Sequence, residues 1–352
     1  AGVAPELPDA ELCPERFMPS EWRSRCLAGH LLYSHLPAHD QLMPEVGNGH
    51  LATVMRSDTI YAAGLFNGPA HGNAGVASHR ARIPRSTIWI DTVHDHKPVL
   101  PGCGRALDVE RAAFLQRTQD PIGAPGLHVE ERWYAPVQAP TVLMHEIDLV
   151  NPSPVPKTVT LMGLPRFESD DLDVRKVQAD RLATMRMKAD SVRAIEGTNR
   201  VPEAPGHKTL FAMAENVLPK SVTAPPKQTT TLYAVVVVVT SLNSTDPTAD
   251  ALATLQYYMA DDFARSKELF SDHTAAWRQR LEAGRIEVAG DLALAQTVNA
   301  SLYFIRSSVR GDWPQGISPG GLSSNCYKGH TFWDQETWML PPLLLLEPPA
   351  AA

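Results

Sequence analysis

Short hydrophobic runs separated by clusters of Pro, Gly, Asn and Asp dominate the first 245 residues of the chain. Residues 51–55, 142–149 and 232–240 are examples, and each has the length of a β-strand. Residues 234–239 are almost all valine, which favours a strand that is buried on both faces. The pattern predicts an all-β domain over residues 31–245, and no repeat period indicates a propeller or solenoid.

A different pattern follows, because apolar residues recur at helical intervals in residues 248–259 and 262–281. Gly284 then supplies a stop signal. A third helix is predicted over residues 291–307, with its first residue, an aspartate, as the candidate N-cap. We therefore expect a helical linker over residues 246–290, after the β-domain.

The composition is that of a globular protein, with 43% hydrophobic and 20% charged residues in 352 positions. A chain of this length is expected to hold about two domains. The net charge of −7 and the lack of a basic run argue against nucleic acid as a partner. The apolar runs at 234–239 and 343–346 are far shorter than the roughly 20 residues that cross a bilayer, so no membrane segment is predicted. Residues 1–30 are expected to be irregular, and because they lack the apolar core of a signal peptide, a cytoplasmic location is favoured.

The four cysteines, Cys13, Cys26, Cys103 and Cys326, are too few and too scattered to indicate a disulfide framework. Free, buried thiols are the expectation. No Cys or His spacing matches a metal site, and no phosphate-binding loop follows a predicted strand. We therefore expect neither a metal nor a cofactor.

Candidate chemistry is concentrated in residues 329–341, which contain Phe332, Trp333, Trp338, one histidine and two carboxylates. Flat indole faces stack on the C–H face of a pyranose ring, while a neighbouring carboxylate accepts hydrogen bonds from sugar hydroxyls. The alternative is that these aromatics form the core face of an amphipathic helix.

Residues 327–341, Tyr-Lys-Gly-His-Thr-Phe-Trp-Asp-Gln-Glu-Thr-Trp-Met-Leu-Pro, resemble glycoside hydrolase family 65. Within the family, Gln335 resembles the animal branch that removes glucose from glucosyl-galactosyl-hydroxylysine of collagen. The same resemblance is carried by residues 47–51, 66–68, 78–84 and 318–323.

The resemblance implies an amino-terminal β-sandwich, a helical linker and an (α/α)6 barrel. Residues 291–352 would begin this barrel, which is expected to be incomplete, because its helices of about 11–12 residues each do not fit in that span. It also implies an inverting α-glucosidase whose acid and base are expected downstream of Ala352, so that this chain alone is inactive. Trp333 and Asp334 would bind the nonreducing glucose, by stacking and by hydrogen bonds.

Other residues of the resembling stretches have competing interpretations. Glu336 is an alternative acid, but residues two apart on a helix point about 200° apart, so a structural role is favoured over a place beside Asp334. For His50, His79 and His330, histidines satisfied by the backbone or interior are the favoured interpretation.

Two other functions remain open at this point. The first is a trehalase or a disaccharide phosphorylase of the same family, and the second is a non-catalytic carbohydrate-binding or interaction protein. We also expect the apolar residues of 290–352 to lack neighbours, so that this part is mobile and prone to self-association, while residues 30–245 fold cooperatively.

Overall fold

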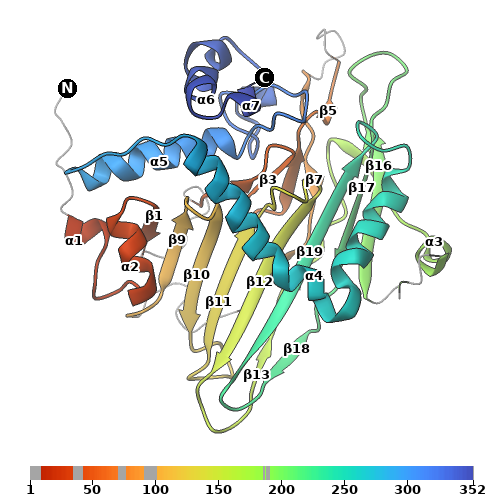
Figure 1. Ribbon diagram of the computed structural model, residues 1–352. Coiled ribbons are helices and arrows are strands. Elements are labelled where there is room, and N and C mark those ends of the chain that lie inside the picture. The colour runs from red at the N-terminus through yellow and green to blue at the C-terminus, as the bar shows by residue number, and fades with distance from the viewer. Residues whose placement is uncertain are drawn as a thin grey trace.

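The computed structural model describes residues 9–34, 43–69, 77–90, 101–184, 187 and 191–351. A nine-stranded antiparallel sheet is the largest element of the described chain (Figure 1). In spatial order its strands are β1 (Leu31–Ser34), β9 (Gly104–Asp108), β10 (Ala113–Gln119), β11 (His128–Tyr134), β12 (Val142–Asn151), β19 (Gln228–Thr240), β17 (Leu210–Asn216), β16 (Val192–Asn199) and β15 (Leu172–Lys176).

Smaller sheets accompany the large one. A four-stranded sheet consists of β2 (Glu45–Gly47), β3 (Leu51–Val54), β4 (Thr59–Ala62) and β7 (Ile83–Pro84). Three two-stranded ribbons pair β5 (Phe66–Asn67) with β6 (His79–Arg80), β8 (Thr87–Trp89) with β14 (Met162–Leu164), and β13 (Lys157–Thr160) with β18 (Ser221–Ala224).

The described helices are α1 (Asp9–Leu12), α2 (Ser20–Leu27), α3 (Ala179–Thr184), α4 (Pro247–Ala283), α5 (Leu292–Arg306), α6 (Leu340–Leu346) and α7 (Pro348–Ala351). A 3-10 turn, η2 (Cys326–Gly329), and a π-helical turn, η3 (Gln335–Met339), lie between α5 and α6. Among the described residues, none of the helices combines the length and hydropathy that crossing a membrane requires. The expected β-rich part followed by helices is confirmed, although α1 and α2 precede the first strand and α3 lies between strands.

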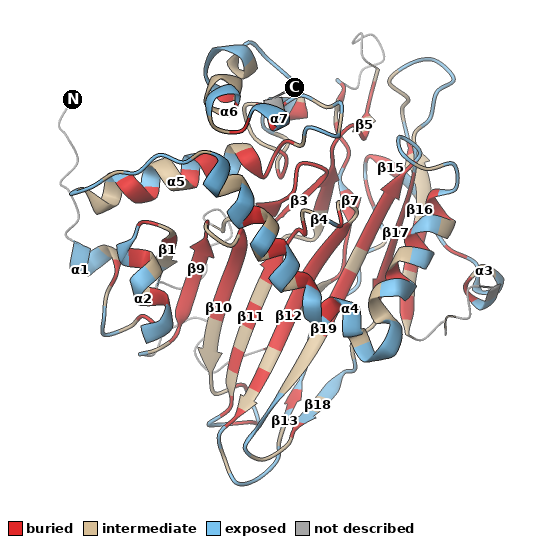
Figure 2. Ribbon diagram, in the orientation of Figure 1, coloured by how far each residue is buried: buried red, intermediate tan, exposed pale blue. Residues whose placement is uncertain are grey.

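The large sheet is covered on both faces. Helix α4 lies across one face and contacts β17 and β19 (Figure 1), where Val235 and Val237 join a core with Leu252. On the other face, Val238 packs with Ile60 of the four-stranded sheet. The valine run of β19 is therefore buried on both faces, as its composition predicted. Figure 2 shows that burial decreases toward β13 and β18.

Helix α4 contains a break that matches the two helices predicted from the sequence. Ala260 has an extended ψ of 153°, and Asp261, Asp262 and Phe263 have positive φ angles of 49°, 54° and 60°. Helix α5 begins where predicted, because the side chain of Asp291 accepts a hydrogen bond from Leu294 N at 2.9 Å.

The amino-terminal segment differs from expectation in two ways. Residues 1–30 were expected to be irregular, yet they include α1 and α2. The expectation of free thiols is wrong for Cys13 and Cys26, which form a disulfide with their Cα atoms 5.9 Å apart. Cys13 directly follows α1 and Cys26 lies in α2, so the path of the chain between them brings the cysteines together, a proximity that their spacing in the sequence did not indicate. Cys103 and Cys326 are free, but only Cys103 is buried.

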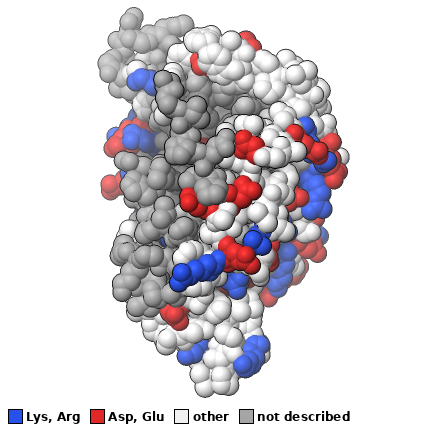
Figure 3. Space-filling model, turned by 90° about the vertical axis from the view of Figure 1, so that its left-hand side faces the viewer, with Lys and Arg blue, Asp and Glu red and all other residues white. Residues whose placement is uncertain are grey.

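Charged side chains of both signs lie side by side on the face shown in Figure 3. This mixture differs from the single-sign basic field that binds nucleic acid backbones.

Candidate functional site

The motif at residues 329–341 adopts an irregular path rather than a regular α-helix. Its centre is the π-helical turn η3, in which Leu340 N donates to Gln335 O. Hydrogen bonds from residue i+5 to residue i widen the turn and bring residues five apart toward the same side. The indole rings of Trp333 and Trp338 accordingly meet edge to face, with their centroids 4.5 Å apart.

The aromatic side chains of the motif are presented to solvent. The exposed fractions are 63% for Trp333, 52% for Trp338 and 42% for Phe332. The interpretation of these residues as a buried core is therefore wrong for all three. Asp334 is half-buried, and no described residue forms a hydrogen bond or ion pair with its carboxylate. An exposed indole face next to a carboxylate with vacant acceptor sites has the chemistry of a sugar-binding surface.

Glu336 has a local partner, because its carboxylate accepts a hydrogen bond from Gln335 Nε2 at 2.8 Å. The other end of the Gln335 amide accepts from Ile317 N at 2.7 Å. Gln335 thereby joins the π-helical turn to the preceding loop.

His330 attaches the start of the motif to the β5–β6 ribbon. Its Nε2 donates to Ser78 O at 2.8 Å, since a carbonyl can only accept. Its ring stacks on Phe66 with a centroid distance of 5.0 Å and an interplanar angle of 8°. Both ring contacts are structural, as favoured from the sequence.

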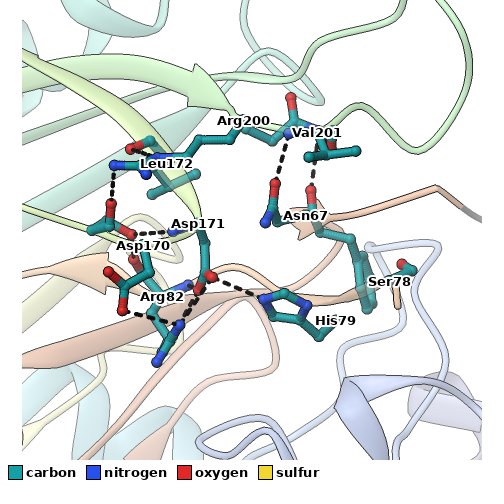
Figure 4. Close-up of polar contacts among 12 residues, drawn as sticks. Asn67, Ser78, His79, Arg82, Asp170, Asp171, Leu172, Arg200 and Val201 are labelled. Carbon is teal, nitrogen blue, oxygen red and sulfur yellow. Dashed lines mark hydrogen bonds and ion pairs between the residues drawn. The ribbon is translucent and has the colours of Figure 1, made fainter. Parts of the chain in front are cut away.

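Strand β6, which begins directly after Ser78, is itself fixed by a buried carboxylate, Asp171 (Figure 4). His79 Nε2 lies 2.8 Å from Asp171 Oδ1, and Arg82 Nε donates to Asp171 Oδ2 at 2.7 Å. Burial opposes the charge of Asp171, but the hydrogen bonds from Arg82 and His79 outweigh it and lower its pKa to about 2. His79 is thus held by a structural contact with Asp171, in agreement with the favoured interpretation of a satisfied loop histidine.

Arg80 ties the same ribbon to the loop that leads into the motif. Its guanidinium donates to four carbonyl oxygens at 2.9–3.2 Å, those of Gly321, Leu322, Ser324 and Gly329. Burial lowers the pKa of Arg80 to about 10, so the group stays charged at neutral pH. Gly329 has a φ of 77°, and a Cβ there would lie 2.8 Å from the Arg80 side chain. The contact therefore requires glycine at this position.

Glu45 holds the same loop, between α5 and η2, through a second set of hydrogen bonds. Its carboxylate accepts hydrogen bonds from Ser307 Oγ at 3.3 Å and from Ser323 Oγ. Burial raises the pKa of Glu45 to about 7, although Ser307 and Arg80 act in the opposite direction. Neither Glu45 nor Arg80 was singled out from the sequence as a site residue. Arg80 lies within one of the resembling stretches, but no local signal identifies its partners.

His50 lies in the interior rather than at a site. Its Nδ1 donates to Pro140 O at 3.2 Å, and its ring meets Trp313 edge on at 4.4 Å. Burial lowers the pKa of His50 to about 4. The expected interior position of His50 is confirmed, but only Nδ1 is satisfied, because the buried Nε2 has no hydrogen-bond partner among the described residues.

A cavity of about 510 Å³ opens beside the motif. Its volume falls within the range of about 300–1,000 Å³ of small-molecule sites. The groups in its wall that could contact a sugar are the indole of Trp313, the carboxylate of Asp312 and the amides of Gln315 and Gln335. The residues that line it are Val309, Arg310, Gly311, Asp312, Trp313, Pro314, Gln315, Gly316, Ile317, Gln335, Leu340 and Ala350.

Comparisons with known proteins give sequence relatives along almost the whole chain, although no family model matches. The chain is 33% identical over 341 residues to protein-glucosylgalactosylhydroxylysine glucosidase of Dictyostelium discoideum, covering 94% of this chain and 45% of that protein. The enzyme of the same name from Mus musculus is 29% identical over 331 residues, covering 90% of this chain and 44% of that protein. The chain spans about half the length of these curated relatives.

Among solved structures, a protein from the human microbiome named as a kojibiose phosphorylase aligns with a TM-score of 0.65 at 15% identity. The match covers 96% of this chain and 46% of that one. It shows a shared fold, with a β-sheet-rich part followed by helices. Together with the sequence relatives, it confirms the resemblance to glycoside hydrolase family 65.

Proposed function

From the relationship of nearly the whole chain to the protein-glucosylgalactosylhydroxylysine glucosidases, we propose that this protein is an inverting α-glucosidase acting on glucosyl-galactosyl-hydroxylysine of collagen. The supporting observation in the structure is the motif, where the exposed indole of Trp333 lies next to the half-buried Asp334, whose carboxylate has no partner among the described residues. In this proposal Trp333 stacks on the nonreducing glucose, and Asp334 accepts hydrogen bonds from its hydroxyls.

The proposed reaction needs two groups besides this binding surface. A carboxylic acid protonates the departing oxygen, and a base activates a water that attacks the anomeric carbon from the opposite face. The family resemblance assigns neither role to a residue of this chain. We assign residues 291–352 to the beginning of an (α/α)6 barrel that holds such groups in this family, after a β-sandwich over residues 31–245 and a linker over 246–290.

The first experiment tests this assignment of the acid and base. The chain of residues 1–352, expressed alone and incubated with glucosyl-galactosyl-hydroxylysine or with trehalose, releases no glucose above a buffer blank. In contrast, the protein as its natural cells produce it, isolated from those cells, releases glucose from glucosyl-galactosyl-hydroxylysine. Release by the isolated chain that disappears in Glu336→Gln would instead make Glu336 the acid and contradict the proposed assignment.

A second candidate reaction is phosphorolysis, which is favoured by the fold shared with a protein named as a kojibiose phosphorylase. The attacking group is then inorganic phosphate rather than water, and the product is glucose 1-phosphate. Product analysis with and without phosphate separates the reactions. Free glucose formed at the same rate in both conditions supports the hydrolase, and a product that depends on phosphate supports the phosphorylase.

A third candidate is a carbohydrate-binding protein without turnover. Neither the exposed tryptophans nor the cavity of about 510 Å³, which Gln335 and Leu340 of the motif help to line, requires an acid or base to hold a sugar. Sugar binding by the protein from its natural source, with no product after prolonged incubation, would favour this candidate over both enzymes.

A further inference from the structure

The disulfide between Cys13 and Cys26 lies inside the protein. Both sulfurs are buried, and the Gln296 side chain of α5 packs against them, with its Nε2 3.6 Å from Cys26 Sγ. The same Nε2 donates to Leu31 O at 3.3 Å. The cross-link therefore belongs to the contact between α2, β1 and α5. Structural disulfides form in oxidising compartments such as the lumen of the endoplasmic reticulum and are rare in the cytosol.

A second feature points to the same compartment. Asn243, Ser244 and Thr245 form the acceptor sequence for N-linked glycans, and they lie in the connection between β19 and α4. Asn243 is exposed, and its side-chain amide forms no hydrogen bond with any described residue. The surrounding turn is well fixed, because Asp246 N donates to Ser244 Oγ at 3.1 Å and Ser244 Oγ donates to Asp250 at 2.5 Å. The acceptor amide is thus free on an ordered turn.

The other acceptor sequence of the chain, at Asn299, is in a contrasting position. Asn299 lies within α5 and is half-buried, and its Nδ2 donates to Gly29 O at 3.0 Å. A sugar attached to this nitrogen would occupy the space of the contact between α5 and Gly29. The folded chain can accommodate a glycan at Asn243 but not at Asn299.

We propose that Asn243 is an N-glycosylation site and that the chain folds in the oxidising compartment where this modification takes place. In the transfer, Asn243 Nδ2 forms a bond to the anomeric carbon of a lipid-pyrophosphate-linked oligosaccharide. The bond from that carbon to the pyrophosphate oxygen breaks, the lipid pyrophosphate leaves with the electron pair, and a base of the transferase takes the amide proton. This inference is independent of the proposed glucosidase activity and revises the location favoured from the sequence.

The cross-link forms in the same compartment by thiol–disulfide exchange. The thiolate of one cysteine attacks a protein disulfide of an oxidoreductase and forms a mixed disulfide, with one oxidoreductase thiol released. The second cysteine of the pair then displaces the remaining oxidoreductase sulfur. Two protons leave the pair, the oxidoreductase disulfide is reduced to two thiols, and Cys13 and Cys26 are joined.

Two leucines give the modification a physical consequence. Leu210 and Leu242 are 46% and 44% exposed, and the strand end at Leu210 is paired with the turn, since Ser241 N donates to Leu210 O at 2.9 Å. A glycan on Asn243, the residue after Leu242, shields this apolar surface from self-association.

The test uses the full gene expressed in the cells that naturally produce the protein. Treatment with a peptide N-glycosidase increases the gel mobility of the wild-type protein by the mass of one glycan. Asn243→Gln and Thr245→Ala already migrate at the deglycosylated position, whereas Thr245→Ser keeps the shift because a hydroxyl remains at the third position. Asn299→Gln shifts like the wild type. A wild-type protein whose mobility does not change, or a shift that disappears in Asn299→Gln and persists in Asn243→Gln, overturns the proposal.

Alkylation of the same purified protein tests the compartment independently. Without reductant, Cys13 and Cys26 are recovered as one cross-linked peptide pair, and the exposed Cys326 is labelled in the native protein. Recovery of Cys13 and Cys26 as labelled thiols contradicts an oxidising compartment, whatever the glycosidase result.

Discussion

The valines of β19 and the leucines of α6 are two apolar runs that occupy different environments. Val235, Val237 and Val238 are completely buried between α4 and the four-stranded sheet, whereas Leu344 and Leu345 are 56% and 83% exposed. Apolar composition alone therefore does not determine burial. The sheet is stabilised by continuous packing on both faces, and the carboxy-terminal segment at residues 307–351 depends more on individual contacts.

The contacts of this segment are both apolar and polar. Leu343 is buried in a small cluster with Met339 and Val309. Glu347 accepts from Arg280 Nε at 2.5 Å and from Arg306 Nε at 3.0 Å. The expectation that apolar residues after 290 lack neighbours is therefore wrong for this cluster. The expected mobility of the segment stays a prediction.

The largest expected effect concerns the packing of the sheet. Phe211 is 1% exposed in the core between the two sheets, and Phe211→Ala should lower the free energy of unfolding by about 3–5 kcal/mol. Urea denaturation measures this loss. The adjacent Leu210, which is 46% exposed, is the matched control, and Leu210→Ala should change stability by less than about 0.5 kcal/mol. Equal losses of stability in the two variants would contradict the claim that packing in the core between the two sheets stabilises the protein more than exposed side chains do.

The next effect concerns the segment alone. Arg80→Met leaves the four carbonyls of residues 321–329 without their donor and should lower the local opening free energy of that loop by about 2–3 kcal/mol. Hydrogen exchange should accelerate by about thirtyfold or more in residues 318–340, with little change in β17 and β19. Arg175→Met, at a residue with 77% side-chain exposure, is the control. Acceleration across the entire nine-stranded sheet would show that this sheet and the segment at residues 307–351 unfold together.

A smaller effect is expected where the two regions join. The pKa of Glu45 is raised from 4.5 to about 7 in the folded protein, so the folded state binds this proton more tightly than the unfolded state. The contribution of protonated Glu45 to the free energy of unfolding is fully present below about pH 4.5 and is lost as the pH rises through 7. The free energy of unfolding of Glu45→Gln, measured relative to wild type, should therefore rise by roughly 2 kcal/mol between pH 5 and pH 8. Parallel stability curves for the two proteins would contradict the raised pKa.

Elements determined by local signals could be predicted from the sequence. The valine run identified a doubly buried strand, and Asp291 identified the start of α5. The motif at Trp333 and Asp334 could be singled out because its aromatics and carboxylates are adjacent in the chain, and its role in sugar binding stays a prediction.

Features that depend on distant pairing could not be predicted. Arg80 contacts carbonyls 241 to 249 positions away, and nothing near it in the chain indicates them. The disulfide depends on the path of the chain from Cys13, after α1, to Cys26 in α2. The π-helical turn was missed because a spacing of five residues between Trp333 and Trp338 is also compatible with an α-helix.

Saturation-transfer NMR of the 352-residue chain with kojibiose tests the central proposal most directly, that Trp333 and Asp334 hold a glucose ring. The wild-type chain should transfer saturation to the C–H protons of the nonreducing ring. Asp334→Asn, which keeps the shape of the side chain, should weaken binding about tenfold, or ~1.4 kcal/mol, while Glu336→Gln binds like wild type. Equal affinity of the wild-type and Asp334→Asn chains would contradict the assignment of this carboxylate to sugar binding.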